Sequence, residues 1–252
     1  MTFFKADGLS INFGGIRALD AVSFDVEAGQ IFTIIGPNGA GKTTIFNLVS
    51  RIYDPRQGRL IFRDEEITRV APHEIARRGI ARTFQNLELF EHATVLHNLL
   101  LGRHAHKRSR FVEELLFLPR VRARELAHRE AAEKVIEFLD LQPYRDRLIA
   151  NLPYGIRKVV ELARALCTEP KLLLLDEPSS GLSVEETEDM AFWIQDIRSL
   201  LDITVLMVEH DMSLVSAVSD RVLALNYGRT IAQGTAREVQ EQPDVVKAYL
   251  GG

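Results

Sequence analysis

Residues 36–43 constrain this chain more than any other segment, because they read Gly-Pro-Asn-Gly-Ala-Gly-Lys-Thr and match the pattern G-x-x-x-x-G-K-S/T in full. Glycines in such a loop let successive backbone N–H groups turn inward around phosphate oxygens, and the positive end of the following helix points at the same anion. Lys42 adds a charge on the β- and γ-phosphates, and the Thr43 hydroxyl can hold Mg²⁺. The β-branched and aromatic run Ile31–Ile35 predicts a strand before the loop, and apolar periodicity over 42–52 predicts a helix after it. The segment therefore predicts a phosphate loop.

The composition of the 252-residue chain excludes several other classes of protein. Its 46% hydrophobic and 26% charged residues are ordinary for a globular protein and too apolar for a disordered chain. Cys167 is the only cysteine, which excludes a disulfide scaffold. The apolar runs are too short to span a bilayer, and Lys5 and Asp7 stand where a signal peptide needs apolar residues. We expect neither a secreted chain nor a membrane span, and the net charge of −4 gives no general attraction to nucleic acid.

The periodicity of the sequence changes twice along the chain. Residues 21–28 alternate as a half-buried strand does, and the first part reads as strands joined by turns. From about 89 to 146 the pattern is helical, with Thr94 as a candidate cap and a pattern at 113–118 among others. The last third alternates buried strands, at 172–175 and 203–208, with a helix that starts at a Ser183–Glu186 capping box. We predict an α/β core with a mainly parallel sheet over 1–88 and 160–252, interrupted by a helical insert over 89–159.

An acidic pair follows the apolar run at 172–175. In a phosphate-loop fold this strand lies beside the strand that precedes the loop, so Asp176 can reach Mg²⁺ directly or through water. Glu177 follows at the strand end, where it can orient or deprotonate an attacking water. Alone, the pair would be an acidic turn after a strand; with the phosphate loop it indicates a nucleotide-hydrolysing site.

Three further features carry weight only in combination with the two above. The amide of Gln85 can contact Mg²⁺ and water together, although an isolated glutamine is more often a surface residue. His210 follows the strand at 203–208, where a γ-phosphate contact is reasonable, although a lone histidine is usually structural. Leu152-Pro153-Tyr154-Gly155 precedes a helix whose start is a candidate anion site, and alone it would be a simple turn.

Taken together and in this order, these residues resemble an ABC-type ATPase subunit over essentially the whole chain. The resemblance implies an ABC fold with an N-terminal antiparallel β part, ATP and Mg²⁺ as ligands, and ATP hydrolysis. Phe13 would stack on adenine, Gln85 would link the γ-phosphate to membrane subunits, and Gly155 would contact ATP bound on an opposite subunit. Glu177 would be the general base and His210 the γ-phosphate switch.

The site residues implied by the motifs and by the resemblance fall into three groups. The candidate catalytic residues are Glu177, His210 and Gln85. The candidate nucleotide contacts are Phe13, Gly36, Pro37, Asn38, Gly39, Ala40, Gly41, Lys42, Thr43, Thr44, Pro153, Tyr154 and Gly155. The candidate Mg²⁺ ligands are Thr43, Gln85 and Asp176.

Finer features resemble the longer of the two ATPase subunits of branched-chain (hydrophobic) amino-acid importers. These features are Leu-Pro-Tyr-Gly, the basic helical insert, Glu-His-Asp-Met at 209–212, and the C-terminal segment 244–251. The resemblance implies a peripheral position at the cytoplasmic face of the cell membrane, on two integral membrane permease subunits. A second, shorter ATPase subunit and an extracytoplasmic solute-binding protein complete the expected partners, and no nucleic acid is expected.

The sequence departs from the family pattern at the signature. Pro153 and Tyr154 replace the usual Ser and first Gly, Ile156 replaces Gln, and Ser183 stands where many relatives have Asp. A serine hydroxyl contact to the opposite γ-phosphate is therefore missing, which costs on the order of 1.5–3 kcal/mol. Helix-end N–H groups do not depend on the side chain, so binding can persist with slower hydrolysis.

Three alternatives remain open at this point. A soluble ABC ATPase acting on nucleic acid or ribosomes is supported only by the local positive charge of residues 103–129, which contain 8 Lys/Arg and 3 Asp/Glu. A non-hydrolysing regulatory cassette is suggested by the altered signature and opposed by the intact Lys42, Asp176, Glu177 and His210. An importer for another small solute, such as urea, amides or organic acids, would use a similar ATPase.

Overall fold

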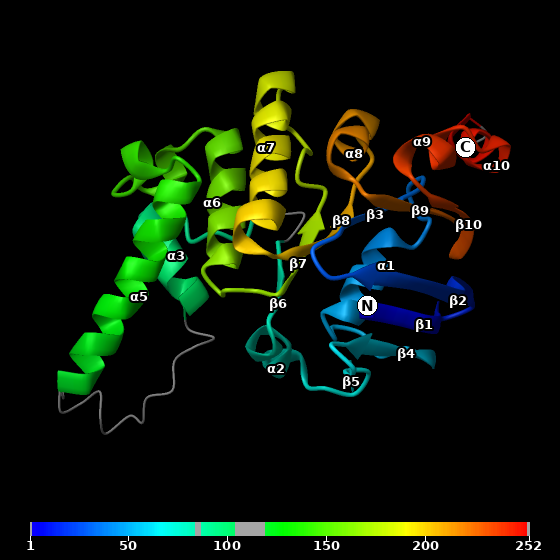
Figure 1. The fold of residues 1–252 in the computed structure, drawn as a ribbon, viewed down its shortest axis with the longest axis horizontal. Helices are drawn as coiled ribbons and strands as arrows, with labels where there is room; N and C mark the ends of the chain where they lie inside the picture. The colour runs from blue at the N-terminus through cyan, green and yellow to red at the C-terminus, as the bar shows by residue number, and fades with distance from the viewer. Residues whose placement is uncertain (1, 84–86, 104–118, 251–252) are drawn as a thin grey trace. The chain divides into compact units, whose positions relative to one another are not determined.

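The structure is a computed structural model that describes residues 2–83, 87–103 and 119–250. The chain forms two compact units, one of Met1–Gln85 with Lys171–Gly252 and one of Asn86–Pro170 (Figure 1). The first unit is α/β and the second is helical in its described part, which confirms the predicted fold class. Residues 160–170, which the sequence analysis assigned to the core, lie in the second unit because they continue a helix that packs within it.

The central sheet of the first unit has six strands in the order β10-β9-β3-β8-β7-β6. Its strands are β3 (Ile31–Ile35), β6 (Ile80–Arg82), β7 (Leu172–Asp176), β8 (Thr204–Val208), β9 (Arg221–Asn226) and β10 (Arg229–Gly234). All neighbours are parallel except β9 and β10. Every residue of β3, β7 and β8 is buried, as expected for parallel strands covered on both faces. The carboxyl ends of these three strands therefore meet at one edge of the sheet.

An antiparallel sheet of four strands, in the order β2-β1-β4-β5, forms the N-terminal part of the same unit. Its strands are β1 (Thr2–Phe13), β2 (Ile16–Glu27), β4 (Gln57–Phe62) and β5 (Glu65–Glu66). Val22, Phe24 and Val26 are buried while their neighbours in β2 are exposed, which confirms the alternation predicted over 21–28. This sheet covers one face of the central sheet.

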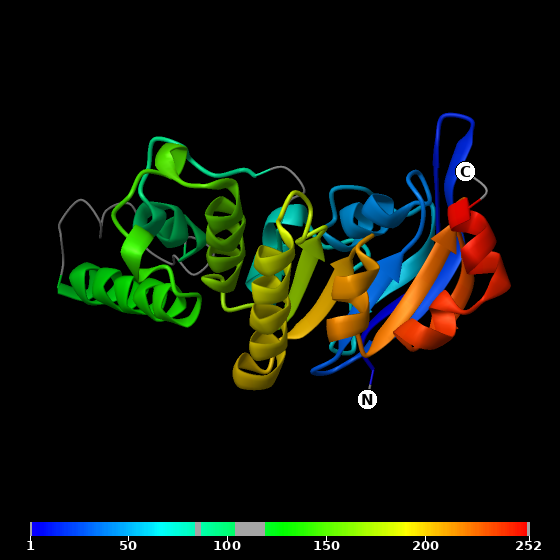
Figure 2. The same ribbon diagram turned by 90° about the horizontal axis from the view of Figure 1, so that it is seen from above.

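The helices of the first unit cover both faces of the central sheet. They are α1 (Lys42–Val49), α2 (Pro72–Ile75), the 3₁₀ helix η1 (Ala76–Arg78), α7 (Val184–Leu201), α8 (Met212–Val218), α9 (Ala236–Gln240) and α10 (Pro243–Leu250). One buried cluster joins the antiparallel sheet and α1 to Phe32 and Ile34 of β3, and another joins α8, α9 and α10 to Ile35. Figure 2 shows α1 and α8 on opposite sides of the strands. The phosphate loop follows β3 between these two layers.

Helix α1 ends at Val49, three residues before the predicted end at 52. Arg51 has a φ of +61°, which stops the helix, and its buried guanidinium donates to the carbonyls of Val70 and Tyr53. The prediction extended the helix to Ile52 because this apolar residue fits the helical periodicity, although its side chain is half exposed. The helix end is therefore determined by a long-range contact that a local pattern does not reveal.

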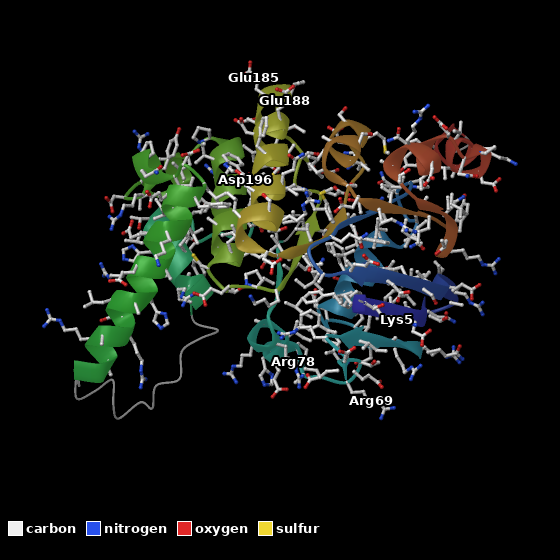
Figure 3. All side chains as sticks on the ribbon, viewed as in Figure 1. Lys5, Arg69, Arg78, Glu185, Glu188 and Asp196 are labelled. Carbon is white, nitrogen blue, oxygen red and sulfur yellow. The ribbon has the colours of Figure 1, made fainter. Side chains whose placement is uncertain are left out.

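Helix α7 begins at the predicted capping box. The Ser183 hydroxyl accepts from the Glu186 N–H, and the Glu186 carboxylate accepts from the Ser183 N–H. The outward face of the helix is acidic, with Glu185, Glu188 and Asp196 in solvent (Figure 3). Among the residues that the structure describes, no helix combines the length and apolar character needed to cross a membrane.

The second unit is a small helical domain. Its described elements are α3 (Val95–Gly102), α5 (Pro119–Phe138), the 3₁₀ helices η3 (Gln142–Tyr144) and η4 (Ile149–Asn151), and α6 (Tyr154–Leu166). Thr94 caps α3 as predicted, and the fully buried Asn98 accepts from the Phe90 N–H and donates to the carbonyls of Phe90 and Thr94. The helical pattern predicted at 113–118 lies outside the described residues.

We predict that the single cysteine is unreactive in the folded protein. Cys167 is buried at the end of α6, and burial raises the pKa of its thiol to about 12, so almost no thiolate exists near neutral pH. A thiol-specific disulfide reagent at pH 8 should label almost no native chain and one equivalent after unfolding in denaturant. Rapid labelling of the native chain would contradict the packing of α6.

Candidate functional site

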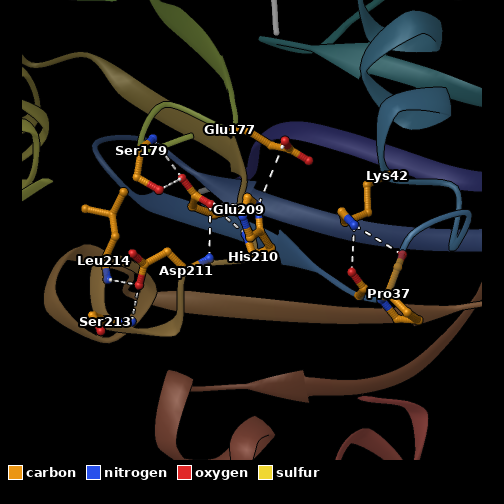
Figure 4. A network of polar contacts seen from close by, with 10 residues as sticks. Pro37, Lys42, Glu177, Ser179, Glu209, His210, Asp211, Ser213 and Leu214 are labelled. Carbon is orange, nitrogen blue, oxygen red and sulfur yellow. Dashed lines mark hydrogen bonds and ion pairs between the residues drawn. The ribbon is translucent and has the colours of Figure 1, made fainter. Parts of the chain in front are cut away.

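The phosphate loop, Asp176, Glu177 and His210 lie at the carboxyl edge of the central sheet. Contrary to the sequence prediction, β7 does not lie directly beside β3, because β8 lies between them and pairs with both. Val208, the last residue of β8, lies opposite Ile34 and Asp176. The phosphate loop follows β3, Glu177 follows β7, and Glu209 and His210 follow β8 (Figure 4). Ligands of open parallel sheets bind at this edge, outside the carboxyl ends of the strands.

The backbone of the phosphate loop leaves no space for side chains at two of its glycines. At Gly36, with a φ of +151°, a Cβ atom would lie 2.3 Å from the carbonyl oxygen of Leu225 in β9. At Gly41, with a φ of +103°, it would lie 2.8 Å from the carbonyl oxygen of Ala18 in β2. Gly39 also has a positive φ of +81°, but its surroundings are open. The loop is thus held between β9 and the antiparallel sheet.

Lys42 begins α1 and is buried inside the loop. Its ammonium donates to the carbonyl oxygens of Gly36, at 2.6 Å, and Pro37, at 3.2 Å. Burial lowers the pKa of Lys42, and the negative charges of Glu177, Asp176 and Glu209 oppose that effect. The lysine charge is therefore available where phosphate oxygens would enter. Thr43 and Thr44, the next residues of α1, are exposed and half-buried respectively.

Asp176 ends β7 as a buried carboxylate with one side occupied. Its Oδ2 accepts from Arg82 Nη2 at 2.8 Å, and Arg82 also donates to Asn47 of α1. Among the described residues, Asp176 Oδ1 has no hydrogen-bond partner although it is buried. An unpaired buried carboxylate oxygen is costly unless a cation or donor satisfies it, so the donor set fits Mg²⁺.

Glu177 has a strained backbone and faces His210. Its φ of +49° is rare for a residue with a side chain, and its N–H donates to the Val208 carbonyl at 2.9 Å. A Glu177 carboxylate oxygen lies 3.9 Å from Nδ1 of His210, whose side chain is 54% exposed. The two predicted catalytic side chains are therefore neighbours at the same edge. Gln85, the third predicted catalytic residue, lies outside the described residues.

The predicted adenine contact belongs to an aromatic pair. Phe13 is exposed at the end of β1, and its ring packs edge-on against Tyr53 with 5.0 Å between ring centroids. Both aromatic side chains are partly exposed, as contact with a base requires. Tyr53 was not predicted, because its place beside Phe13 depends on how the segment after α1 returns along β1.

The C-terminal helix also reaches the phosphate loop. A hollow of about 450 Å³ is lined by loop residues Pro37 and Asn38 and by Asp244 and Lys247 of α10, among others. Burial raises the pKa of Tyr249, in the same helix, against the opposing effect of a hydrogen bond with the Gly36 backbone. This hollow lies on the outer side of the loop, because neither Lys42 nor Asp176 lines it.

The signature-like turn lies in the second unit at the start of α6. Pro153 is the N-cap and supplies no side-chain cap, Tyr154 is exposed and Gly155 is buried. Arg157 donates to the carbonyl oxygens of Leu152, at 2.9 Å, and Ala150, at 2.8 Å, which holds the turn in place. The N-cap residue therefore offers no side-chain acceptor to the first N–H groups of the helix, where an anion contact is expected.

Comparisons with known protein families agree with the nucleotide-binding geometry of this site. The family described as ABC transporter matches residues 19–180, and a family described as branched-chain amino acid ATP-binding cassette transporter matches residues 229–252. This chain belongs to the ABC transporter family. It is therefore an ABC ATPase.

Relatives and solved structures that resemble this chain along its length are ATP-binding cassettes. The high-affinity branched-chain amino acid transport ATP-binding protein BraF of Pseudomonas aeruginosa is 41% identical over 98% of this chain and 97% of its own length. A crystal structure of a nucleotide-free ATP-binding cassette from an ABC transporter superposes with a TM-score of 0.88 and 32% identity, covering 100% of both chains. A crystal structure of a cassette in its ADP conformation superposes with a TM-score of 0.87 and 31% sequence identity, again covering 100% of both chains.

Two polar residues of this cassette were not singled out in the sequence. Arg82 connects α1 to Asp176, and Glu209 accepts hydrogen bonds from residues after both β7 and β8. A signal for Glu209 existed, because it follows five apolar or β-branched residues that form a wholly buried strand. For Arg82 the sequence held no such signal, since its partners lie 35 and 94 residues away.

Alanine substitutions in the phosphate loop should distinguish the cost of a steric clash from the cost of a positive φ angle. Gly36→Ala forces a Cβ against a backbone carbonyl and should lower the free energy of unfolding by about 3 kcal/mol or more. Gly39→Ala meets open space, so only the positive φ is penalised, by about 1–2 kcal/mol. Thermal unfolding of the nucleotide-free cassette measures both. Equal losses of stability for the two variants would contradict the loop geometry.

Proposed function

We propose that this ABC ATPase is the motor subunit of an importer for branched-chain or other hydrophobic amino acids. The observation that carries the proposal is the junction of three strand ends, where the phosphate loop, Asp176, Glu177 and His210 come together in one unit. The similarity to branched-chain amino acid ATP-binding proteins runs along nearly the whole chain and supports the choice of substrate class.

The phosphate loop and Lys42 would bind the phosphates of ATP. Backbone N–H groups between Gly36 and Thr43 would face the anion, and Lys42 supplies a buried positive charge. Asp176 and the Thr43 hydroxyl would hold Mg²⁺, with Gln85 as the third expected ligand. The metal ion would neutralise charge that develops on the phosphate oxygens.

Glu177 would orient and deprotonate the attacking water. The carboxylate is mostly buried, and it stands at the edge where the phosphates would bind. His210 is exposed enough to contact a γ-phosphate and lies beside Glu177. Its movement toward or away from that phosphate would report the state of the nucleotide.

A second ATPase subunit would complete each nucleotide site. The uncapped start of α6, with Pro153, Tyr154 and Gly155, would contact ATP held by the opposite subunit. Because backbone N–H groups supply this contact, the missing serine hydroxyl would slow hydrolysis without removing it. We infer a different, shorter partner chain and closure around two ATP molecules.

The remaining partners follow from transport. Two integral membrane permease subunits would receive the motion of the two ATPases at the cytoplasmic face of the cell membrane, and an extracytoplasmic solute-binding protein would deliver the amino acid. Substrate choice resides in the permeases and the binding protein, so urea, amide or organic-acid import would leave this chain's chemistry unchanged.

Glu177→Gln should lower ATP turnover by about 10²–10⁴-fold while ATP affinity is retained, because only the proton acceptor is lost. Steady-state phosphate release and equilibrium ATP binding by the reconstituted complex measure the two effects. Glu188→Gln, which removes an exposed carboxylate from α7, is the matched control and should leave turnover unchanged. Unchanged turnover in the Glu177 variant would defeat the assignment of the base.

Purification from gently solubilised membranes of the native host tests the assembly. A tagged copy of this chain should recover two multi-span permeases and a second ATPase, and the associated binding protein should bind leucine, isoleucine or valine. Recovery with ribosomes or nucleic acid, or with no membrane protein, would contradict the importer. A binding protein that prefers another solute would keep the motor function and change the substrate.

A further inference from the structure

Glu209 is a fully buried carboxylate that receives hydrogen bonds from two different loops. Its Oε1 accepts from the Ser179 N–H at 2.9 Å and from the Ser179 hydroxyl at 2.5 Å. Its Oε2 accepts from the N–H groups of His210, at 2.6 Å, and Asp211, at 3.1 Å (Figure 4). One side chain therefore connects the turn after β7 to the loop after β8.

The backbone of Glu209 adds a third connection. Its N–H donates to the carbonyl of Ile34 at 3.2 Å, one residue before the end of β3 and two before the phosphate loop begins. Glu177, two residues before Ser179, donates its own N–H to Val208, the residue before Glu209. The segments that carry Lys42, Glu177 and His210 thus converge on this one residue.

The contacts of Glu209 are those of an ionised carboxylate. Every partner donates, so both oxygens serve as acceptors, and a buried charge is tolerated because it is hydrogen-bonded on both sides. Three of the four donors are backbone N–H groups, and that of Ser179 would be left buried without this acceptor if the carboxylate were absent. A neutral amide at this position cannot satisfy all of them, because it has a single acceptor oxygen.

We propose that Glu209 is a positioning residue for ATP hydrolysis, which fixes the turn that carries Glu177 against the loop that carries His210. The proposal deepens the proposed function and rests on it. Nδ1 of His210 lies 3.9 Å from a carboxylate oxygen of Glu177 and 3.5 Å from one of Glu209. The Glu209 carboxylate is therefore in a position to determine the distance between the two candidate catalytic side chains.

Glu209→Gln is the direct test. The glutamine amide would place its oxygen toward the donors of one loop and its NH₂ group toward the donors of the other. The turn after β7 and the loop after β8 should then no longer be held in a fixed position relative to each other, while the phosphate loop stays formed. In the reconstituted complex, kcat should fall by about 10–100-fold, with KM for ATP changed by less than about threefold. In the nucleotide-free chain, amide hydrogen exchange should rise together in the segments 177–180 and 209–212.

Ser179→Ala is the second variant, because it removes one donor and leaves the carboxylate in place. It should lower kcat several-fold, and its effect should be much smaller in the Glu209→Gln background, since both changes break the same contact. Thr235→Ala is the control, because it removes the side-chain cap of α9 and should raise exchange only there. If Glu209→Gln fails to fold, the Ser179 variant carries the same comparison of kcat, KM and exchange.

The outcomes separate this inference from the function on which it rests. Loss of kcat at constant KM, with exchange raised in both segments, supports positioning by Glu209. Wild-type kcat in both variants, or loss of kcat only in proportion to the folded fraction, overturns it. Glu177→Gln is run alongside: if that variant loses turnover and Glu209→Gln does not, the motor function stands and the positioning role fails. If neither loses turnover, the proposed function fails first.

Discussion

No side chain fits at Gly36 or Gly41, and the first unit is organised around that close packing. The carbonyl of Leu225 occupies the space beside Gly36, and that of Ala18 occupies the space beside Gly41. The phosphate loop therefore contacts β9 on one side and the antiparallel sheet on the other. Because the loop is held from both sides, less of its backbone has to be ordered when an anion binds, which reduces the entropy cost of binding.

The charges at the carboxyl edge of the central sheet are balanced by contacts among buried groups. Arg82 neutralises one oxygen of Asp176, Lys42 lies near three carboxylates, and Glu209 is satisfied by donors from two loops. Removing one partner of such a network leaves a buried charge unpaired, which costs several kcal/mol. Among the described residues, Oδ1 of Asp176 has no hydrogen-bond partner, and it lies where the proposed metal ion would bind.

Local patterns predicted the strands and helices that border the site and indicated its candidate residues, while long-range contacts were beyond them. The phosphate loop, the Asp176–Glu177 pair and the cap at Ser183 are each encoded within a few residues, so the sequence reveals them directly. Glu209, Arg82 and Tyr53 take their meaning from which strand lies beside which, and a single sequence does not state that pairing. The end of α1 was misplaced for the same reason, since Arg51 bonds to the distant Val70. The roles of the signature residues came from family resemblance and stay predictions.

ATP hydrolysis at these strand ends is proposed to drive amino-acid uptake. The most direct measurement is the accumulation of labelled leucine by proteoliposomes that contain this chain, its partner ATPase and the two permeases, with binding protein on the outside and ATP enclosed. We expect uptake that requires both ATP and binding protein and that disappears when this chain carries Glu177→Gln. ATP hydrolysis without uptake of leucine, isoleucine or valine, or uptake that persists in the variant, would contradict it.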